Sequence, residues 1–162
     1  MKYNKMFLLV IMLLPWLSVP FLGKRTFKRF YPGALFIGAL IIVESSIAKR
    51  RVWWRFYEKL IPHIIGEMPL LIGPFFVGSL WILKFTFGKF FRYLFLNFVT
   101  DSLFVYPGAL ILKKWGIVSL VRMRNYQLLL LCLAKSVLMY GVQSLIEKIR
   151  RKPKSLIQRL FS

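Results

Sequence analysis

Four ionisable side chains lie within long apolar stretches of this sequence: Glu44, Glu67, Asp101 and Lys135. Placing an aspartate or a lysine at the centre of a membrane helix costs about 2.5–3.5 kcal/mol on translocon-derived scales. Proteins keep such groups where they form pairs, line a cavity or exchange a proton. These four positions are therefore the first candidates for a functional site.

Asp101 and Lys135 form the pair that the spacing favours, because each lies near the middle of its apolar segment and the two segments are consecutive. A short connection makes consecutive helices antiparallel neighbours. Asn97 shares a helix face with Asp101 and extends the polar stripe. Two interpretations stay open: a buried ion pair that sets the register of two helices, or a charge-coupled site where a substrate or a proton competes.

His63 and Glu67 stand four residues apart, so a helix presents them on one face. They form either a hydrogen-bonded pair at the membrane edge or a relay that moves a proton between the interface and the interior. His63 is the single histidine of the chain. Two ligands do not define a metal site, so we predict no metal and no cofactor.

Glu44 lies about one helical turn before the cations Lys49, Arg50 and Arg51. We expect its carboxylate to reach toward those cations, or to join Ser45 in a hydroxyl-lined helix contact.

Enzyme signatures are missing from the sequence. It has no Gly-x-Ser-x-Gly elbow, no phosphate-binding glycine loop, no Cys-x-x-Cys and no His-Glu-x-x-His. We therefore expect a protein that is not an enzyme.

The candidate residues lie in five apolar segments that are long enough to cross a bilayer. Of the 162 residues, 58% are hydrophobic and 19% are charged, whereas ordinary domains are about 45–50% apolar and about 25% charged. In lipid each segment must satisfy its own backbone hydrogen bonds, which favours helices. The predicted spans are residues 6–22, 32–48, 61–83, 93–112 and 126–142.

The predicted fold class is all-α: an integral membrane bundle of about five transmembrane helices with a basic amphipathic C-terminal tail. The multi-pass domain covers residues 1–142 and the tail covers residues 143–162. The first span also resembles a signal peptide, but it lacks a small-x-small cleavage site and four positive charges follow it, so we expect a retained anchor. In the tail, apolar residues recur at helical spacing amid lysine and arginine. We expect it to lie on the membrane surface with a break near Pro153; a partner's groove is the alternative.

Prolines divide the third span. Pro69 and Pro74 each remove a backbone donor and should bend or break the helix. We favour a bent helix that packs on its neighbours through nearby glycines. The alternative is a discontinuous helix whose exposed backbone groups bind a substrate or an ion.

The charge distribution indicates the surroundings of the bundle. The net charge is +20, from 25 Lys and Arg against 5 Asp and Glu. No polar stretch is long enough for a basic nucleic-acid-binding domain, so anionic lipid headgroups are the expected partner and nucleic acid is not. Aromatic and guanidinium groups alternate in one stretch between spans, which predicts a membrane-interface segment: Arg50, Arg51, Trp53, Trp54, Arg55 and Tyr57.

The sequence predicts the location and the function of the protein only in general terms. Lysine and arginine are slightly more numerous on the side that holds the C-terminus, which predicts a cytoplasmic C-terminus. The Lys/Phe/Ile-rich composition fits a bacterial cytoplasmic membrane. We expect a non-catalytic membrane component that binds a partner membrane protein or an anionic lipid. The alternative is a small transporter, or its membrane subunit, that uses the intramembrane charges; with so few spans it would function as a homo-oligomer.

Overall fold

The structure, a computed structural model, describes residues 2–57 and 66–160, with the backbone alone for residues 2 and 152–160. Within these residues five helical segments are long and apolar enough to cross a membrane. They are Tyr3–Leu22, Lys24–Arg51, Met68–Thr86, Phe90–Lys114 and Asn125–Arg151. This confirms the predicted all-α bundle of a multi-pass membrane protein, with several spans longer than the apolar runs because flanking basic residues continue the helices.

The first span bends at its prolines. It consists of α1 (Lys2–Leu13), a 3₁₀ turn (Leu14–Ser18) and α2 (Val19–Leu22). Gly23, with a φ of 86°, then reverses the chain into the long helix α3 (Lys24–Arg51). A positive φ is accessible to glycine at little steric cost, so this residue type permits the tight turn.

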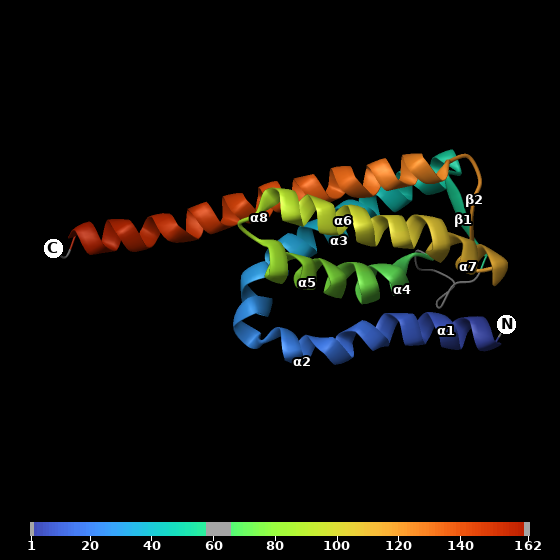
Figure 1. The fold of residues 1–162 in the computed structure, drawn as a ribbon, viewed down its shortest axis with the longest axis horizontal. Coiled ribbons are helices and arrows are strands. Elements are labelled where there is room, and N and C mark those ends of the chain that lie inside the picture. Colours follow the sequence, from blue (N-terminus) through green and yellow to red (C-terminus); the bar gives the residue numbers. More distant parts are fainter. Residues whose placement is uncertain (1, 58–65, 161–162) are drawn as a thin grey trace.

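A two-stranded sheet pairs two of the connections between helices at one end of the bundle. The strand β1 (Trp54–Phe56) follows α3 and pairs antiparallel with β2 (Val118–Leu120), with Trp54 opposite Leu120 and Phe56 opposite Val118. The N-terminus of the chain lies at this same end, and the C-terminus lies at the other (Figure 1). We refer to the two ends as the sheet end and the opposite end.

The third span is a bent, continuous helix, as favoured from its prolines. It consists of α4 (Met68–Leu70), a π-helical turn (Leu71–Phe75) that contains Pro74, and α5 (Phe76–Thr86). A Cβ on Gly73 would lie 2.5 Å from the carbonyl oxygen of Ile11 and 2.8 Å from the Cα of Met12. The absent side chain therefore allows the third span to touch the backbone of α1.

The last two spans complete the bundle. The fourth consists of α6 (Phe90–Leu103), a π-helical turn (Phe104–Gly108) and α7 (Ala109–Lys114). The fifth is α8 (Asn125–Leu160), which projects beyond the bundle at the opposite end (Figure 1). It runs through Pro153 without the predicted break, because one proline removes a single helical hydrogen bond and the turns on either side persist.

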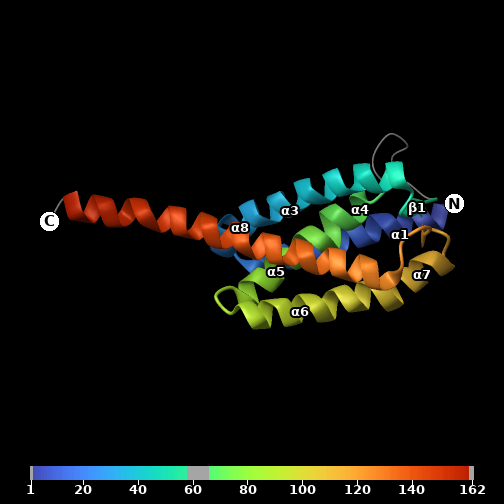
Figure 2. The ribbon, with the colours of Figure 1, turned by 90° about the horizontal axis from the view of Figure 1, so that it is seen from above.

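The core lies among α3, α5, α6 and α8. Its buried apolar residues are Leu22, Phe30, Ala34, Ile37, Ile41, Leu80, Leu83, Tyr93 and Met139. Figure 2 shows α8 between α3 and α6, and it packs against both. α1 packs on α4 and the following π turn, away from α8.

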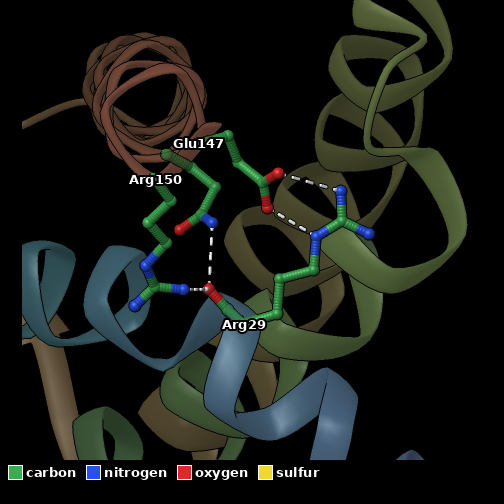
Figure 3. Close-up of polar contacts among 4 residues, drawn as sticks. Arg29, Glu147 and Arg150 are labelled. Atoms are coloured by element: carbon green, nitrogen blue, oxygen red, sulfur yellow. Dashed lines mark hydrogen bonds and ion pairs between the residues drawn. The ribbon is translucent and has the colours of Figure 1, made fainter. Parts of the chain in front are cut away.

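Arg29 anchors α8 to the start of α3 (Figure 3). Its Nε and Nη2 donate to the Glu147 carboxylate at 2.5 and 3.2 Å, and its carbonyl oxygen accepts from Gln143 Nε2 at 3.0 Å. Gln143 is fully buried, and it fits because Gly33 has no side chain: a Cβ there would lie 2.7 Å from Gln143 Oε1. These contacts hold α3 and α8 together near the opposite end.

Candidate functional site

A cavity of about 340 Å³ lies inside the bundle beneath the small sheet. Its walls come from α3, α4 with the π turn, α7, the two strands and α8, and most of its lining is apolar, as in small-molecule sites of this size. We call it the sheet-side cavity. Its lining residues with charged or amide side chains are Glu44, Glu67, Lys113, Asn125 and Lys135.

Lys135 pairs with Glu44, and the predicted pairing with Asp101 is wrong. The Lys135 Nζ lies 2.6 Å from Glu44 Oε2, and both side chains are largely buried. The prediction that Glu44 reaches toward Lys49, Arg50 and Arg51 is wrong as well. The physical reason is the packing of α3 on α8, which turns Glu44 inward and places Lys135 opposite it.

Glu67 accepts hydrogen bonds from two other elements of the cavity wall. Ser45 Oγ donates from α3, and Trp54 Nε1 donates from β1. These two hydrogen bonds replace much of the hydration that a carboxylate loses when it is buried. The predicted partner of Glu67, His63, lies outside the described residues, so the proton relay stays a prediction.

Asp101 and Asn97 face a second space, which we call the mid-bundle cavity. It has a volume of about 260 Å³ and lies between α3, α5, α6 and α8. Asn97 is buried there: its Nδ2 donates to the Tyr93 carbonyl at 2.9 Å, and its Oδ1 accepts from Ser136 Oγ at 3.1 Å. The Asp101 Oδ2 is buried and accepts no hydrogen bond from the described residues.

Lys135 lies at the boundary between the two cavities. It lines both of them, as do Cys132, Phe75, Phe104 and Ile41. Glu44 lines only the sheet-side cavity and Asp101 only the mid-bundle cavity. The structure thus gathers Glu44, Glu67, Asp101, Lys135 and Asn97 around one continuous interior region, although the pairing differs from that predicted.

The predicted membrane-interface segment lies at the sheet end. Arg50, Arg51, Arg55 and Tyr57 are exposed there, whereas Trp53 and Trp54 are half-buried. Tyr57 Oη lies 3.1 Å from Ser119 Oγ on the paired strand. The position at one end of the bundle suits a headgroup contact, which stays a prediction.

Exposed cations lie on α7 and on the connection that follows it, among and next to residues that line the sheet-side cavity. Of its lining residues, Leu110 and Lys113 on α7 are exposed. Lys114 follows on the same helix. Arg122 and Arg124 are exposed on the connection to α8, and they flank the lining residue Met123.

Sequence reasoning missed several partners in this site. Ser45 and Ser136 directly follow Glu44 and Lys135, so hydroxyls beside intramembrane charges were the available signal. The inward turn of Trp54 had no such signal, because an indole among arginines is equally typical of a membrane surface. Among the described residues, no group of three His, Cys, Asp or Glu is placed to hold a metal ion.

No protein-family model, curated protein or solved structure matches this chain. Its function is therefore inferred from the geometry alone.

Proposed function

We propose that this protein is a non-catalytic, multi-pass membrane component that binds an anionic lipid in the sheet-side cavity. The observation that carries the proposal is the combination of a mostly apolar cavity of about 340 Å³ with exposed cations on α7 and on the connection after it, where Leu110 and Lys113 are exposed lining residues. An amphiphile with an acyl chain and a negative headgroup matches both parts.

The acyl chain would enter the apolar part of the cavity from the lipid side. Leu110 is 62% exposed on α7, while Leu70 and Leu112 inside are each 5% exposed. An apolar surface that continues from the outside of α7 into the interior gives a chain an uninterrupted path. Each methylene that it buries contributes about 0.8 kcal/mol.

The headgroup would remain near the exposed cations of α7 and of the connection after it. Lys113, Lys114, Arg122 and Arg124 are exposed there, and each cation near an anionic lipid contributes on the order of 1 kcal/mol. Deeper in the cavity, Lys135 is already neutralised by Glu44, so the excess positive charge lies on α7 and on the connection after it. This arrangement selects a negative headgroup without drawing it into the interior.

The test is native mass spectrometry of the protein purified gently from its own membrane, followed by exchange into nanodiscs of phosphatidylglycerol or phosphatidylcholine. We expect retention of the anionic lipid over the zwitterionic one. Lys113→Gln with Lys114→Gln should reduce that retention at least about fivefold. The matched control, Lys24→Gln with Lys28→Gln, removes the same charge at the opposite end and should retain the lipid.

Three outcomes would overturn the lipid proposal. Equal retention of the two lipids would show that the headgroup charge is not recognised. Equal losses in the two double variants would show that overall charge, and not the cations of α7, attracts lipid. A stoichiometric protein bound in place of lipid would make this chain an assembly subunit.

A small transporter is the second candidate, and the position of Lys135 favours it. This ammonium lines both cavities, with Glu44 and Glu67 in the sheet-side cavity and Asp101 in the mid-bundle cavity. A transporter needs the charges for function, whereas a structural pair can be replaced. Normal abundance with loss of the in-vivo phenotype in Glu44→Gln with Lys135→Met, which strands neither member of the pair, supports transport; an intact phenotype excludes a transporter coupled to this pair.

We further propose that the protein resides in a bacterial cytoplasmic membrane with its C-terminus in the cytoplasm. The support is the slight excess of lysine and arginine at the opposite end, where α8 leaves the bundle.

A further inference from the structure

The hydroxyl groups around the mid-bundle cavity have no hydrogen left to offer a ligand. Ser79 Oγ donates to the Phe76 carbonyl at 2.7 Å, and Thr100 Oγ1 donates to the Leu96 carbonyl at 2.7 Å. Ser136 Oγ donates within the bundle as well. Each hydroxyl has one hydrogen and two lone pairs, so these side chains present acceptors to the cavity.

Asp101 adds a negative charge to this acceptor-rich lining. Its Oδ2 is buried and accepts no hydrogen bond from the described residues. The one cation that lines the same cavity, Lys135, is engaged with Glu44 at 2.6 Å. A buried carboxylate oxygen without a donor is strongly unfavourable in an apolar interior. A ligand that carries both a positive charge and N–H donors would relieve this cost.

The rest of the lining indicates the body of that ligand. Ile37, Ile82 and Met139 are apolar, and Phe75 and Phe104 contribute two aromatic rings whose centroids lie 5.0 Å apart. A bare inorganic ion would leave most of a space of about 260 Å³ unfilled. An apolar body fills it, and aromatic faces also attract cations.

We propose that the mid-bundle cavity binds a small organic ammonium ion, with its ammonium group on Asp101 and its apolar body against the packed rings of Phe75 and Phe104. This site adjoins the sheet-side cavity and shares Phe75, Phe104 and Lys135 with it, but it does not depend on the lipid proposal. It assigns a role to Asp101, whose carboxylate takes no part in an ion pair within the described residues. Ser79 and Thr100 accept the remaining N–H groups of the ammonium.

The experiment is calorimetric titration of the protein in nanodiscs with hexylammonium, with empty nanodiscs as the baseline and hexan-1-ol as the uncharged probe of similar shape. Wild-type protein should bind hexylammonium more tightly than hexan-1-ol. Asp101→Asn should weaken hexylammonium binding at least about tenfold, because it removes a charged acceptor. Glu147→Gln removes the same charge outside the cavity and should bind as wild type.

A second variant blocks the cavity without touching Asp101. Gly78 lines the cavity, and a Cβ built there meets no atom within 4 Å. Gly78→Leu should fill the space and weaken hexylammonium binding, while the better helix propensity of leucine keeps α5 folded.

Several results would overturn the proposal. One is a wild-type affinity for hexylammonium in Asp101→Asn or in Gly78→Leu. Another is an equal affinity of the wild-type protein for the amine and for the alcohol. A third is complete displacement of the amine by sodium chloride, at a salt concentration at which Glu147→Gln remains folded. Because lipid retention is measured separately, failure here leaves the lipid proposal standing.

Discussion

Lys135 and Glu44 meet at 2.6 Å across the interface of α3 and α8, although 91 residues separate them in the chain. Their side chains are 14% and 11% exposed. The pair joins the second span to the last one at the boundary of two cavities, so it affects both the stability of the bundle and the charge of its interior.

Removing one member of this pair should destabilise the protein strongly. Glu44→Gln or Lys135→Met strands the other charge inside the bundle, and breaking a buried pair typically costs about 3–5 kcal/mol. Glu44→Gln combined with Lys135→Met should recover much of that loss. Reversible unfolding in mixed micelles measures the free energy of each variant. Asp101→Asn is the control, because the Asp101 Oδ2 accepts no hydrogen bond from the described residues and its removal leaves no partner unpaired. An equal loss of unfolding free energy in Asp101→Asn would mean that both carboxylates stabilise the Lys135 ammonium.

The close contact of the third span with α1 should not tolerate a side chain at Gly73. Gly73→Ala places a Cβ against the carbonyl oxygen of Ile11 and the Cα of Met12, and such backbone atoms cannot turn aside. We expect a loss of about 1–3 kcal/mol, seen as a lower thermal midpoint. Gly78→Ala, made at a position with no atom within 4 Å, should be neutral or stabilising. If the two variants behave alike, α1 does not pack as closely as described.

Gln143 should matter more to stability than the ion pair beside it. Gln143 is fully buried and donates to the Arg29 carbonyl at 3.0 Å, which Arg150 Nη1 also reaches at 3.4 Å. Gln143→Ala loses the shorter hydrogen bond and leaves a cavity, so it should cost about 2–4 kcal/mol. The Arg29 side chain is 46% exposed, and Glu147→Gln should cost no more than about 1 kcal/mol. Thermal unfolding of the two variants compares them. The reverse order would indicate that the Arg29–Glu147 pair is the main clamp.

The proposed orientation predicts which introduced thiols a reagent can reach from outside. Cys132 is the single cysteine of the sequence and is buried, so Cys132→Ser gives a background without thiols. In that background, Arg122→Cys at the sheet end should react with an impermeant maleimide in intact cells, and Arg25→Cys at the opposite end should react only after lysis. The opposite pattern would place the C-terminus outside the cytoplasm.

Much of the fold could be predicted from the chain because lipid imposes a simple constraint. Each span must satisfy its own backbone hydrogen bonds, so apolar length alone predicts helices. The third span has a π-helical turn at Pro74, where the proline removes a backbone donor. The continuation of α8 through Pro153 was not predicted, because whether a proline interrupts a helix depends on the turns around it.

The sequence indicated which charged residues would lie in the apolar segments, but it did not indicate which of them would pair. That Glu44, Glu67, Asp101 and Lys135 would be kept inside the bundle follows from the cost of a charge in an apolar run, which the sequence alone reveals. Which of them meet depends on the side-by-side order and rotation of the helices. Proximity along the chain favoured Asp101 for Lys135, whereas α3 packs on α8 and brings Glu44 there. The spans and the charges inside them can be read from the order of residues, whereas the partners of those charges and the two cavities depend on helix packing, which is set by contacts between residues far apart in the chain.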